Sequence, residues 1–222
     1  SSVNRPDVKD KHWDDYVDPE TSVEFFASFL RIALQHCVER VPVYQWHATR
    51  RQALVEEAWK ANGLLVHQTI IWAKARGVLT YSHYLWSHEP AFYGWREGSQ
   101  PEKDRWPDPS QRTVWEIDQA DEEKGLHPTM KPLEIFERPI VSHTRRGEVV
   151  LEPFSGSGTQ IIAAERHGRR CFAMELSPAF VDAAVLRWQR ATGQQATLDG
   201  DGRSFAVIAS ERIEPAGEPE ES

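Results

Sequence analysis

The most informative segment of the chain reads Glu148-Val-Val-Leu-Glu-Pro-Phe-Ser-Gly-Ser-Gly-Thr159. Its apolar residues, Val149 to Leu151, predict a short buried strand that ends at an acid and a proline. Gly156 and Gly158 predict a tight turn, and the run Ile161-Ile-Ala-Ala164 after them predicts a helix. A strand, a glycine turn and a helix in this order are typical of a doubly wound α/β sheet, which binds a nucleotide-like ligand beyond its strand ends.

The residues of this turn also exclude some nucleotides. A dinucleotide fingerprint would need a third glycine where Ile161 stands, and a phosphate-binding loop would need a lysine after Gly158. The acid at the strand end, Glu152, would repel a pyrophosphate and suits a cationic ligand. We therefore expect a nucleoside-like, partly cationic ligand. S-adenosylmethionine, with its sulfonium and ammonium groups, fits this description.

A second apolar segment, residues 170–175, predicts the next strand and ends at Glu175. In a nucleotide-binding fold, an acid about 20 residues beyond the glycine turn accepts hydrogen bonds from the ribose hydroxyls. Leu176 would then pack on the adenine ring. The alternative is that Glu175 is only a solvated acid at a strand end. Its combination with the glycine turn favours the ribose role.

The rest of the chain alternates between predicted helices and strands. We expect helices at residues 24–38, 49–62, 132–142 and 178–191, and strands at 41–46, 64–72 and 86–93. Residues 96–124 are charged and rich in proline, which predicts an inserted surface loop. The alternation predicts an α/β fold with a doubly wound, mostly parallel sheet and helices on both of its faces.

The composition is typical of a globular protein and bears on its cellular location. Of the 222 residues, 40% are hydrophobic and 27% are charged. The sequence has no apolar run of the length needed to cross a membrane, and its start lacks the apolar core of a signal peptide. Cys37 and Cys171 lie in apolar patterns and are expected to be reduced core thiols. We therefore expect a cytoplasmic protein that does not contact the membrane.

The formal net charge of −8 argues against a simple basic nucleic-acid binder, but not against a DNA enzyme with a local basic face. Part of the negative charge lies in residues 206–222, which are rich in Glu, Pro and Gly and are expected to form a disordered acidic tail.

Three segments, taken together, resemble the DNA amino-methyltransferases that act on N4 of cytosine or N6 of adenine. They are His127-Pro-Thr-Met-Lys-Pro132, Glu152-Pro-Phe-Ser-Gly-Ser-Gly-Thr159, and Glu175. The order of the segments is similar to the circularly permuted class, in which the catalytic half precedes the cofactor half. Upstream, Val43-Tyr-Gln-Trp-His47 and His88-Glu-Pro-Ala-Phe-Tyr-Gly-Trp95 agree with it. The resemblance runs from about residue 24 to residue 198.

The resemblance implies a Rossmann-like methyltransferase fold and a set of residues around S-adenosylmethionine. Thr129 and Lys131 would meet the carboxylate of the cofactor, Glu175 would hold its ribose, and Thr159 would cap the helix. The family usually has aspartate at position 152, so the longer Glu152 implies an indirect contact. The implied cofactor-binding residues are Thr129, Lys131, Glu152, Pro153, Phe154, Gly156, Ser157, Gly158, Thr159, Glu175 and Leu176.

The resemblance also implies a double-stranded DNA substrate whose target base is flipped out of the helix. The residues expected to border the flipped base are Trp46, His47, His88, Phe92 and Tyr93. Phe92 or Tyr93 would stack on the base, but for either residue alone, packing in an aromatic core is an equal alternative. No metal site is expected, because His83, His88 and Glu89 lack further ligands at a defined spacing.

The catalytic motif of this family, Asp/Asn/Ser-Pro-Pro followed by Tyr or Phe, does not occur in the sequence. In the permuted class it would lie upstream of Ser1, so we expect this chain to be part of a longer enzyme; the rival is a pseudoenzyme. We expect one methyltransferase domain at 1–205, divided into a catalytic half (1–95), a target-recognition loop (96–124) and a cofactor half (125–205).

The expected activity is site-specific methylation of N6 of adenine in DNA. The alternatives are N4 of cytosine, a non-catalytic module that binds cofactor or DNA, and a methyltransferase that acts on RNA or a small molecule. A homodimer and a restriction endonuclease partner are further expectations from the resemblance.

Overall fold

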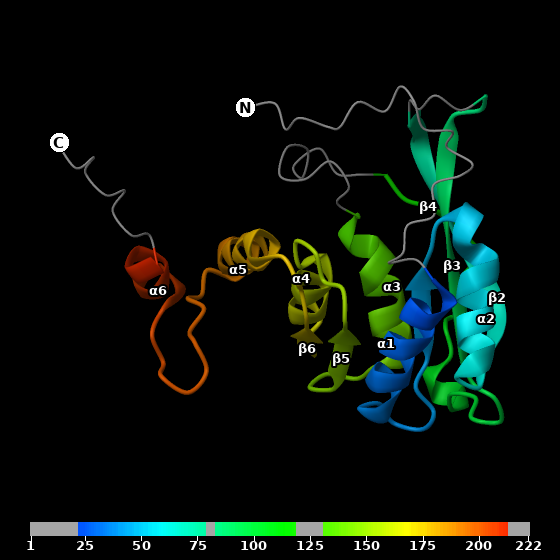
Figure 1. Ribbon diagram of the computed structural model, residues 1–222, viewed down its shortest axis with the longest axis horizontal. Coiled ribbons are helices and arrows are strands. Elements are labelled where there is room, and N and C mark those ends of the chain that lie inside the picture. Colours follow the sequence, from blue (N-terminus) through cyan, green and yellow to red (C-terminus); the bar gives the residue numbers. More distant parts are fainter. Residues whose placement is uncertain (1–21, 79–82, 119–130, 213–222) are drawn as a thin grey trace, which may run out of the picture. The chain divides into compact units, whose positions relative to one another are not determined.

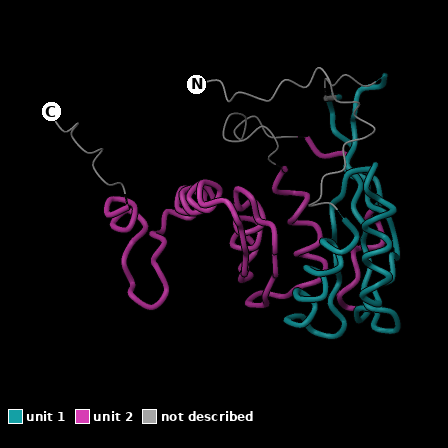
Figure 2. The backbone as a smooth tube through the Cα atoms, in the orientation of Figure 1, with its two compact units in different colours: residues 1–103, 112–115 teal, residues 104–111, 116–222 magenta. Residues whose placement is uncertain are grey.

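The computed structural model describes residues 22–78, 83–118 and 131–212. The backbone divides into two compact units (Figure 2). Unit 1 comprises residues 1–103 and 112–115, and unit 2 comprises residues 104–111 and 116–222. The elements are labelled in Figure 1. Among the described residues, no helix is both long enough and apolar enough to cross a membrane.

Unit 1 contains a four-stranded sheet with two helices. Its helices are α1 (Val23–Gln35) and α2 (Gln52–Ala61), and a single 3-10 turn, η3 (Thr49–Arg51), precedes α2. Its strands are β1 (Val43–Trp46), β2 (Leu64–Val78), β3 (Trp86–Arg96) and β4 (Val114–Glu116), in the spatial order β1-β3-β2-β4. Another short 3-10 turn, η4 (Lys103–Arg105), lies between β3 and β4.

The core of unit 1 forms where the apolar faces of α1 and α2 meet the sheet. Val55, Ala58 and Trp59 of α2 are fully buried and pack with Leu30 of α1 and Phe92 of β3. The indole Nε1 of Trp59 donates to the Gln45 amide oxygen at 2.5 Å, so the polar atom of this large side chain is also satisfied inside the protein. Trp59 is thus the largest fully buried side chain among the described residues.

The strands of unit 1 correct one part of the sequence prediction. β3 runs antiparallel to both of its neighbours, β1 and β2. It follows β2 through a short connection, whereas a parallel neighbour would need a crossover of a dozen residues or more. β1 and β2 therefore run in the same direction, as the strand–helix–strand pattern predicted, but β3 is inserted between them. The sheet of unit 1 is thus not mostly parallel.

Unit 2 contains the glycine-turn segment. In chain order its elements are α3 (Leu133–His143), β5 (Val149–Glu152), α4 (Thr159–Arg166), β6 (Arg170–Ala173), α5 (Pro178–Thr192) and α6 (Phe205–Arg212). β5 and β6 are parallel and paired residue by residue from Val149↔Arg170 to Glu152↔Ala173. Ala163, Ala164 and Ile140 pack against Val150 and Cys171, so α3 and α4 cover one face of this pair.

The predicted helices and strands are confirmed with small changes at most of their ends, although β2 continues to Val78 and not only to residue 72. Two other segments differ. Residues 114–116 of the predicted surface loop form the edge strand β4, and the Thr113 carbonyl accepts from the Ile71 amide at 2.7 Å. Residues 205–212 form α6, although 206–212 were expected to be part of a disordered tail. This part of the tail is Phe-Ala-Val-Ile-Ala-Ser-Glu-Arg, which lacks the Pro and Gly that follow it. The remainder, 213–222, lies outside the described residues.

Candidate functional site

The glycine turn of unit 2 lies where β5 ends and α4 begins. Gly156 and Gly158 both adopt positive φ angles, 53° and 78°, and Gly158 is the N-cap residue of α4. A Cβ on Gly158 would lie 2.7 Å from Cβ of Ala184 on α5, so only glycine fits there. Thr159 does not cap the helix as predicted: the cap has no side-chain hydrogen bond, and the Thr159 hydroxyl instead accepts from Arg187. No local pattern in the sequence pointed to this partner, because Arg187 lies on another helix.

Glu152, the acid at the end of β5, turns back toward the protein. One of its oxygens accepts from the Phe154 amide at 2.9 Å, and the other accepts from the Gln160 side-chain amide at 3.0 Å. Burial raises the pKa of the Glu152 carboxyl, while these two hydrogen bonds and the charge of Lys131 oppose that rise. Both oxygens of Glu152 thus brace the turn from within the protein.

Glu175, the acid after β6, is tied directly to the same turn. Its two carboxylate oxygens accept from the Gly156 amide at 2.8 Å and from the Ser177 amide at 2.9 Å. A carboxylate has about four acceptor positions, so two remain for a ligand hydroxyl. The ladder also continues beyond the strands, since the Ser155 amide donates to the Met174 carbonyl at 2.9 Å. The two acids and both strand ends therefore meet at one turn, as the sequence predicted.

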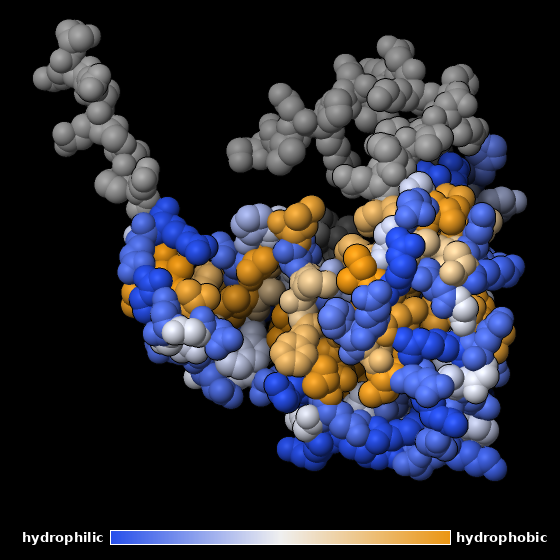
Figure 3. All heavy atoms as spheres, turned by 60° about the horizontal axis from the view of Figure 1, so that its bottom comes forward, coloured by the Kyte–Doolittle hydropathy of each residue, from blue (hydrophilic) through white to orange (hydrophobic). Residues whose placement is uncertain are grey.

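Large apolar side chains surround these strand ends and reach the solvent. Phe154 is 51% exposed, Met174 is 57% exposed and Leu176 is 97% exposed. Hydrophobic side chains also stand out among hydrophilic ones on the surface in Figure 3. An exposed apolar rim beside two carboxylates is the arrangement that an amphipathic ligand with a flat ring and polar groups requires. Lys131 is half-buried, and its positive charge acts to lower the pKa of the Glu152 carboxyl. Thr129 lies outside the described residues.

The five residues expected around a flipped base all belong to unit 1 and differ in how deeply they are buried. Phe92 and Tyr93 are adjacent on β3 and point to opposite faces of the sheet. Phe92 is 2% exposed and packs against Trp59, while Tyr93 is 4% exposed and stacks on Tyr44 with ring centroids 4.6 Å apart. Both rings are thus occupied by protein contacts, which favours the alternative of aromatic core packing over base stacking.

The other three predicted base-pocket residues are more accessible. Trp46 and His47 are half-buried at the end of β1, and the Nε2 atom of His47 is buried without a hydrogen-bond partner among the described residues. His88 is half-buried on β3, two residues before Pro90. Its neighbour Glu89 pairs with Lys74 at 2.7 Å, so this carboxylate already has a cationic partner.

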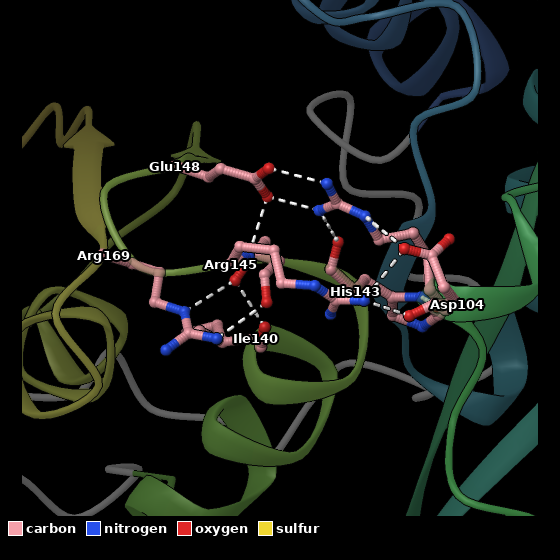
Figure 4. A network of polar contacts seen from close by, with 8 residues as sticks. Asp104, Ile140, His143, Arg145, Glu148 and Arg169 are labelled. Atoms are coloured by element: carbon pink, nitrogen blue, oxygen red, sulfur yellow. Dashed lines mark hydrogen bonds and ion pairs between the residues drawn. The ribbon is translucent and has the colours of Figure 1, made fainter.

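Part of the predicted target-recognition segment is anchored within unit 2 by a polar network (Figure 4). Arg105 donates to both carboxylate oxygens of Glu148, at 2.5 and 2.7 Å, and the Arg145 amide donates to the same carboxylate. The pKa of Glu148 is lowered to about 2, and the hydrogen bond from Arg105 is the largest cause. His143 lies 2.6 Å from the Arg105 carbonyl through Nδ1, and burial lowers its pKa to about 4. The network fixes residues 104–105 beside the start of β5, the end opposite the glycine turn.

Comparisons with known proteins agree with this geometry. A sequence profile described as DNA methylase, for N6 and N4 methyltransferases, matches residues 7–186. The chain is 32% identical over 148 residues to the type II methyltransferase M.Cfr9I of Citrobacter freundii. This match covers 62% of the present chain and 47% of M.Cfr9I. It is 40% identical over 63 residues to M2.DpnII of Streptococcus pneumoniae, covering 28% and 24% of the two chains. The matches therefore span less than half the length of these relatives.

Solved structures share the fold at low sequence identity. The complex of M1.HpyAVI with SAM has a TM-score of 0.62 at 22% identity and covers 78% of this chain and 82% of its own. The cytosine-N4-specific PvuII DNA methyltransferase has a TM-score of 0.67 at 14% identity and covers 91% and 79%. A putative DNA modification methylase of Thermus thermophilus, complexed with S-adenosyl-L-methionine, scores 0.59 at 22% identity and covers 82% and 79%. The predicted Rossmann-like methyltransferase fold is confirmed.

Proposed function

Because the chain belongs to the N6/N4 DNA methylase family, we propose that unit 2 binds S-adenosylmethionine and that the protein methylates an exocyclic amine of a DNA base. One observation carries the cofactor assignment: the Glu175 carboxylate accepts from the Gly156 amide, which joins the ribose acid and the glycine turn in one rigid unit. When bound, the cofactor supplies the methyl group. The chain's own residues bind and orient it.

The residues of unit 2 fit the parts of this cofactor. The remaining acceptor positions of Glu175 suit the ribose hydroxyls, and the exposed Leu176 beside it offers an apolar surface for the adenine ring. The turn from Pro153 to Ser157, braced by Glu152, would border the methionine portion, whose positive groups favour nearby carboxylates. Lys131, with Thr129 before it, would neutralise the cofactor carboxylate.

For the target base we propose Trp46, His47 and His88 as the bordering side chains. They are the predicted pocket residues that are not fully buried, and the His47 ring packs on Phe92 with ring centroids 4.4 Å apart. The half-buried ring of Trp46 at the end of β1 offers a stacking surface, worth about 1–3 kcal/mol per base in single-strand binders. We propose adenine N6 as the target, with cytosine N4 as the alternative. A cytoplasmic location, a homodimer and a restriction endonuclease partner remain proposals.

The catalytic residues are proposed to come from a segment outside the 222 residues, since the sequence contains no Asp/Asn/Ser-Pro-Pro-Tyr/Phe motif. The sheet of unit 2 supports this: among the described strands, β5 has a single neighbour, β6, so its other edge can accept a further strand. A two-stranded sheet this short is marginal by itself. The same missing motif favours one second candidate function, a non-catalytic module that binds cofactor or DNA.

The test is methyl transfer by the longest protein that contains this chain. The protein is incubated with duplex DNA and S-adenosylmethionine carrying a labelled methyl group, and the DNA is then digested to nucleosides. We expect label in N6-methyladenine and a much lower yield from Glu175→Ala. Label in N4-methylcytosine would support the alternative base. Cofactor binding without any product would support the non-catalytic candidate, and transfer only to RNA or a small molecule would contradict a DNA substrate.

A further inference from the structure

We propose that Arg187 of α5 is a positioning residue that holds the glycine turn in its ligand-binding conformation and thereby sets the affinity for the cofactor. This inference rests on the proposed function of unit 2. Arg187 is 7% exposed, although arginine is among the residues least often buried. It lies within α5 (Pro178–Thr192), outside every motif from which the family resemblance was drawn.

Three hydrogen bonds join Arg187 to the turn. Its Nη1 atom donates to the Ser157 carbonyl at 2.6 Å, to the Ser157 hydroxyl at 3.0 Å and to the Thr159 hydroxyl at 3.2 Å. These two residues flank Gly158. One helical turn before Arg187, Ala184 packs where a Cβ of Gly158 would be. The same face of α5 therefore contacts the turn through one apolar and one charged side chain.

The Ser157 carbonyl explains why the turn needs an external donor. Ser157 lies between Gly156 and Gly158, both at positive φ angles, so the residues on either side of it are conformationally permissive. A carbonyl buried without a donor costs free energy, and a charged donor makes the stronger hydrogen bond. The Gly158 amide belongs to the same peptide group and donates to the Ser155 carbonyl at 2.9 Å, so Arg187, by fixing the Ser157 carbonyl, also holds this internal hydrogen bond of the turn. Loss of the guanidinium would therefore loosen the turn without removing a ligand-contacting group.

Arg169 provides a matched control within the same unit. Its guanidinium also donates to two carbonyls, those of Thr144 at 2.7 Å and His167 at 2.5 Å, and to the Thr144 hydroxyl at 2.9 Å. Arg169 stands directly before β6, whereas the glycine turn meets the far ends of β5 and β6. The two arginines thus make the same kind of bonds at opposite ends of the strands. If both arginines only stabilised the fold, replacing either one should have a similar effect on cofactor affinity.

The experiment compares the wild-type chain with Arg187→Met, Arg187→Lys and Arg169→Met. Affinity for S-adenosylmethionine is measured by calorimetric titration, and amide hydrogen exchange is followed for residues 155–162. We expect Arg187→Met to weaken binding by roughly tenfold or more, as for the loss of a charged hydrogen bond, and to speed exchange in the turn. Arg187→Lys, which keeps the charge and donates from a single nitrogen atom, should recover part of the affinity. Arg169→Met should change affinity less than about twofold, even if it lowers the melting temperature equally.

Two outcomes would overturn the inference. One is equal loss of affinity in Arg187→Met and Arg169→Met, which would mean that both act only through stability. The other is unchanged exchange at the turn in Arg187→Met. The exchange measurement needs no ligand, so it decides the role of Arg187 even if the wild-type chain were to bind no S-adenosylmethionine. Failure of the wild-type chain to bind S-adenosylmethionine would contradict the proposed function, but not the role of Arg187 in holding the turn.

Discussion

The two units of this chain differ in how completely they bury their apolar side chains. In unit 1, Trp59 of α2 and Phe92 of β3 are buried where the helices pack on the sheet, and Tyr93 stacks on Tyr44. In unit 2, Phe172 on β6 and Leu176 beyond its end remain 53% and 97% exposed. Exposed apolar surface next to a polar rim is a feature of binding sites rather than of finished cores. The described residues of unit 1 therefore include a core of large buried aromatic side chains, whereas those of unit 2 leave apolar side chains exposed on β6 and beyond its end.

The largest expected effect concerns the packing of unit 1. Trp59→Ala should lower the free energy of unfolding of unit 1 by about 3–5 kcal/mol, because it opens a large cavity and leaves the Gln45 amide oxygen without its donor. The matched substitution in unit 2, Phe172→Ala, should cost less than about 1 kcal/mol, because that ring is half exposed. Urea unfolding followed by circular dichroism measures both. Equal losses would contradict the contrast between the units.

The second effect is a pH dependence that belongs to unit 2. The folded unit keeps His143 neutral, since burial lowers its pKa to about 4, whereas the unfolded chain takes up the proton near pH 6.5. The unfolded state therefore binds more protons between these values, and the free energy of unfolding falls as the pH drops through this window. We expect a loss of about 2 kcal/mol between pH 7 and pH 5.

His143→Gln is the control for this effect. Glutamine keeps a donor that can reach the Arg105 carbonyl but does not titrate. The variant should retain nearly the same free energy of unfolding at pH 7 and pH 5, as measured by urea titration at both values. An acid-induced loss as large as that of the wild type would show that another group is responsible.

The smallest effect lies within the glycine turn. Gly156→Ala places a Cβ in open space, so only the strain of its positive φ opposes it, at about 1 kcal/mol. Gly158→Ala adds a collision with Ala184 and should cost about 1 kcal/mol more. Thermal unfolding of unit 2, compared between the two variants, measures the difference. A Gly158 variant as stable as the Gly156 variant would mean that α5 does not press on the turn.

The sequence was sufficient to predict the glycine turn because its determinants are local. Gly156, Gly158 and the apolar segments on either side specify a strand, a turn and a helix without reference to distant residues. The meeting of Glu152 and Glu175 at that turn also followed, since parallel strands present their carboxyl ends at one edge.

What the sequence did not specify depends on pairing between distant segments. The insertion of β3 between β1 and β2 is invisible in a pattern that alternates helix and strand, because periodicity does not say which strands are neighbours. The strand predicted at 86–93 already implied opposite directions for Phe92 and Tyr93, but the burial of both rings depends on what covers each face of the sheet. Arg187 could not be assigned a role either, because its partners are about 30 residues away.

The measurement that tests the account most directly is calorimetric titration of the 222-residue chain with S-adenosylmethionine. Three proteins are compared: the wild type, Glu175→Ala, and Glu134→Ala, which removes a surface acid of α3 that pairs with Arg138. We predict one binding site, affinity weakened by roughly tenfold or more in Glu175→Ala, and unchanged affinity in Glu134→Ala. Equal affinity in the wild type and Glu175→Ala, or no binding by a folded wild-type chain, would contradict a cofactor site at the glycine turn.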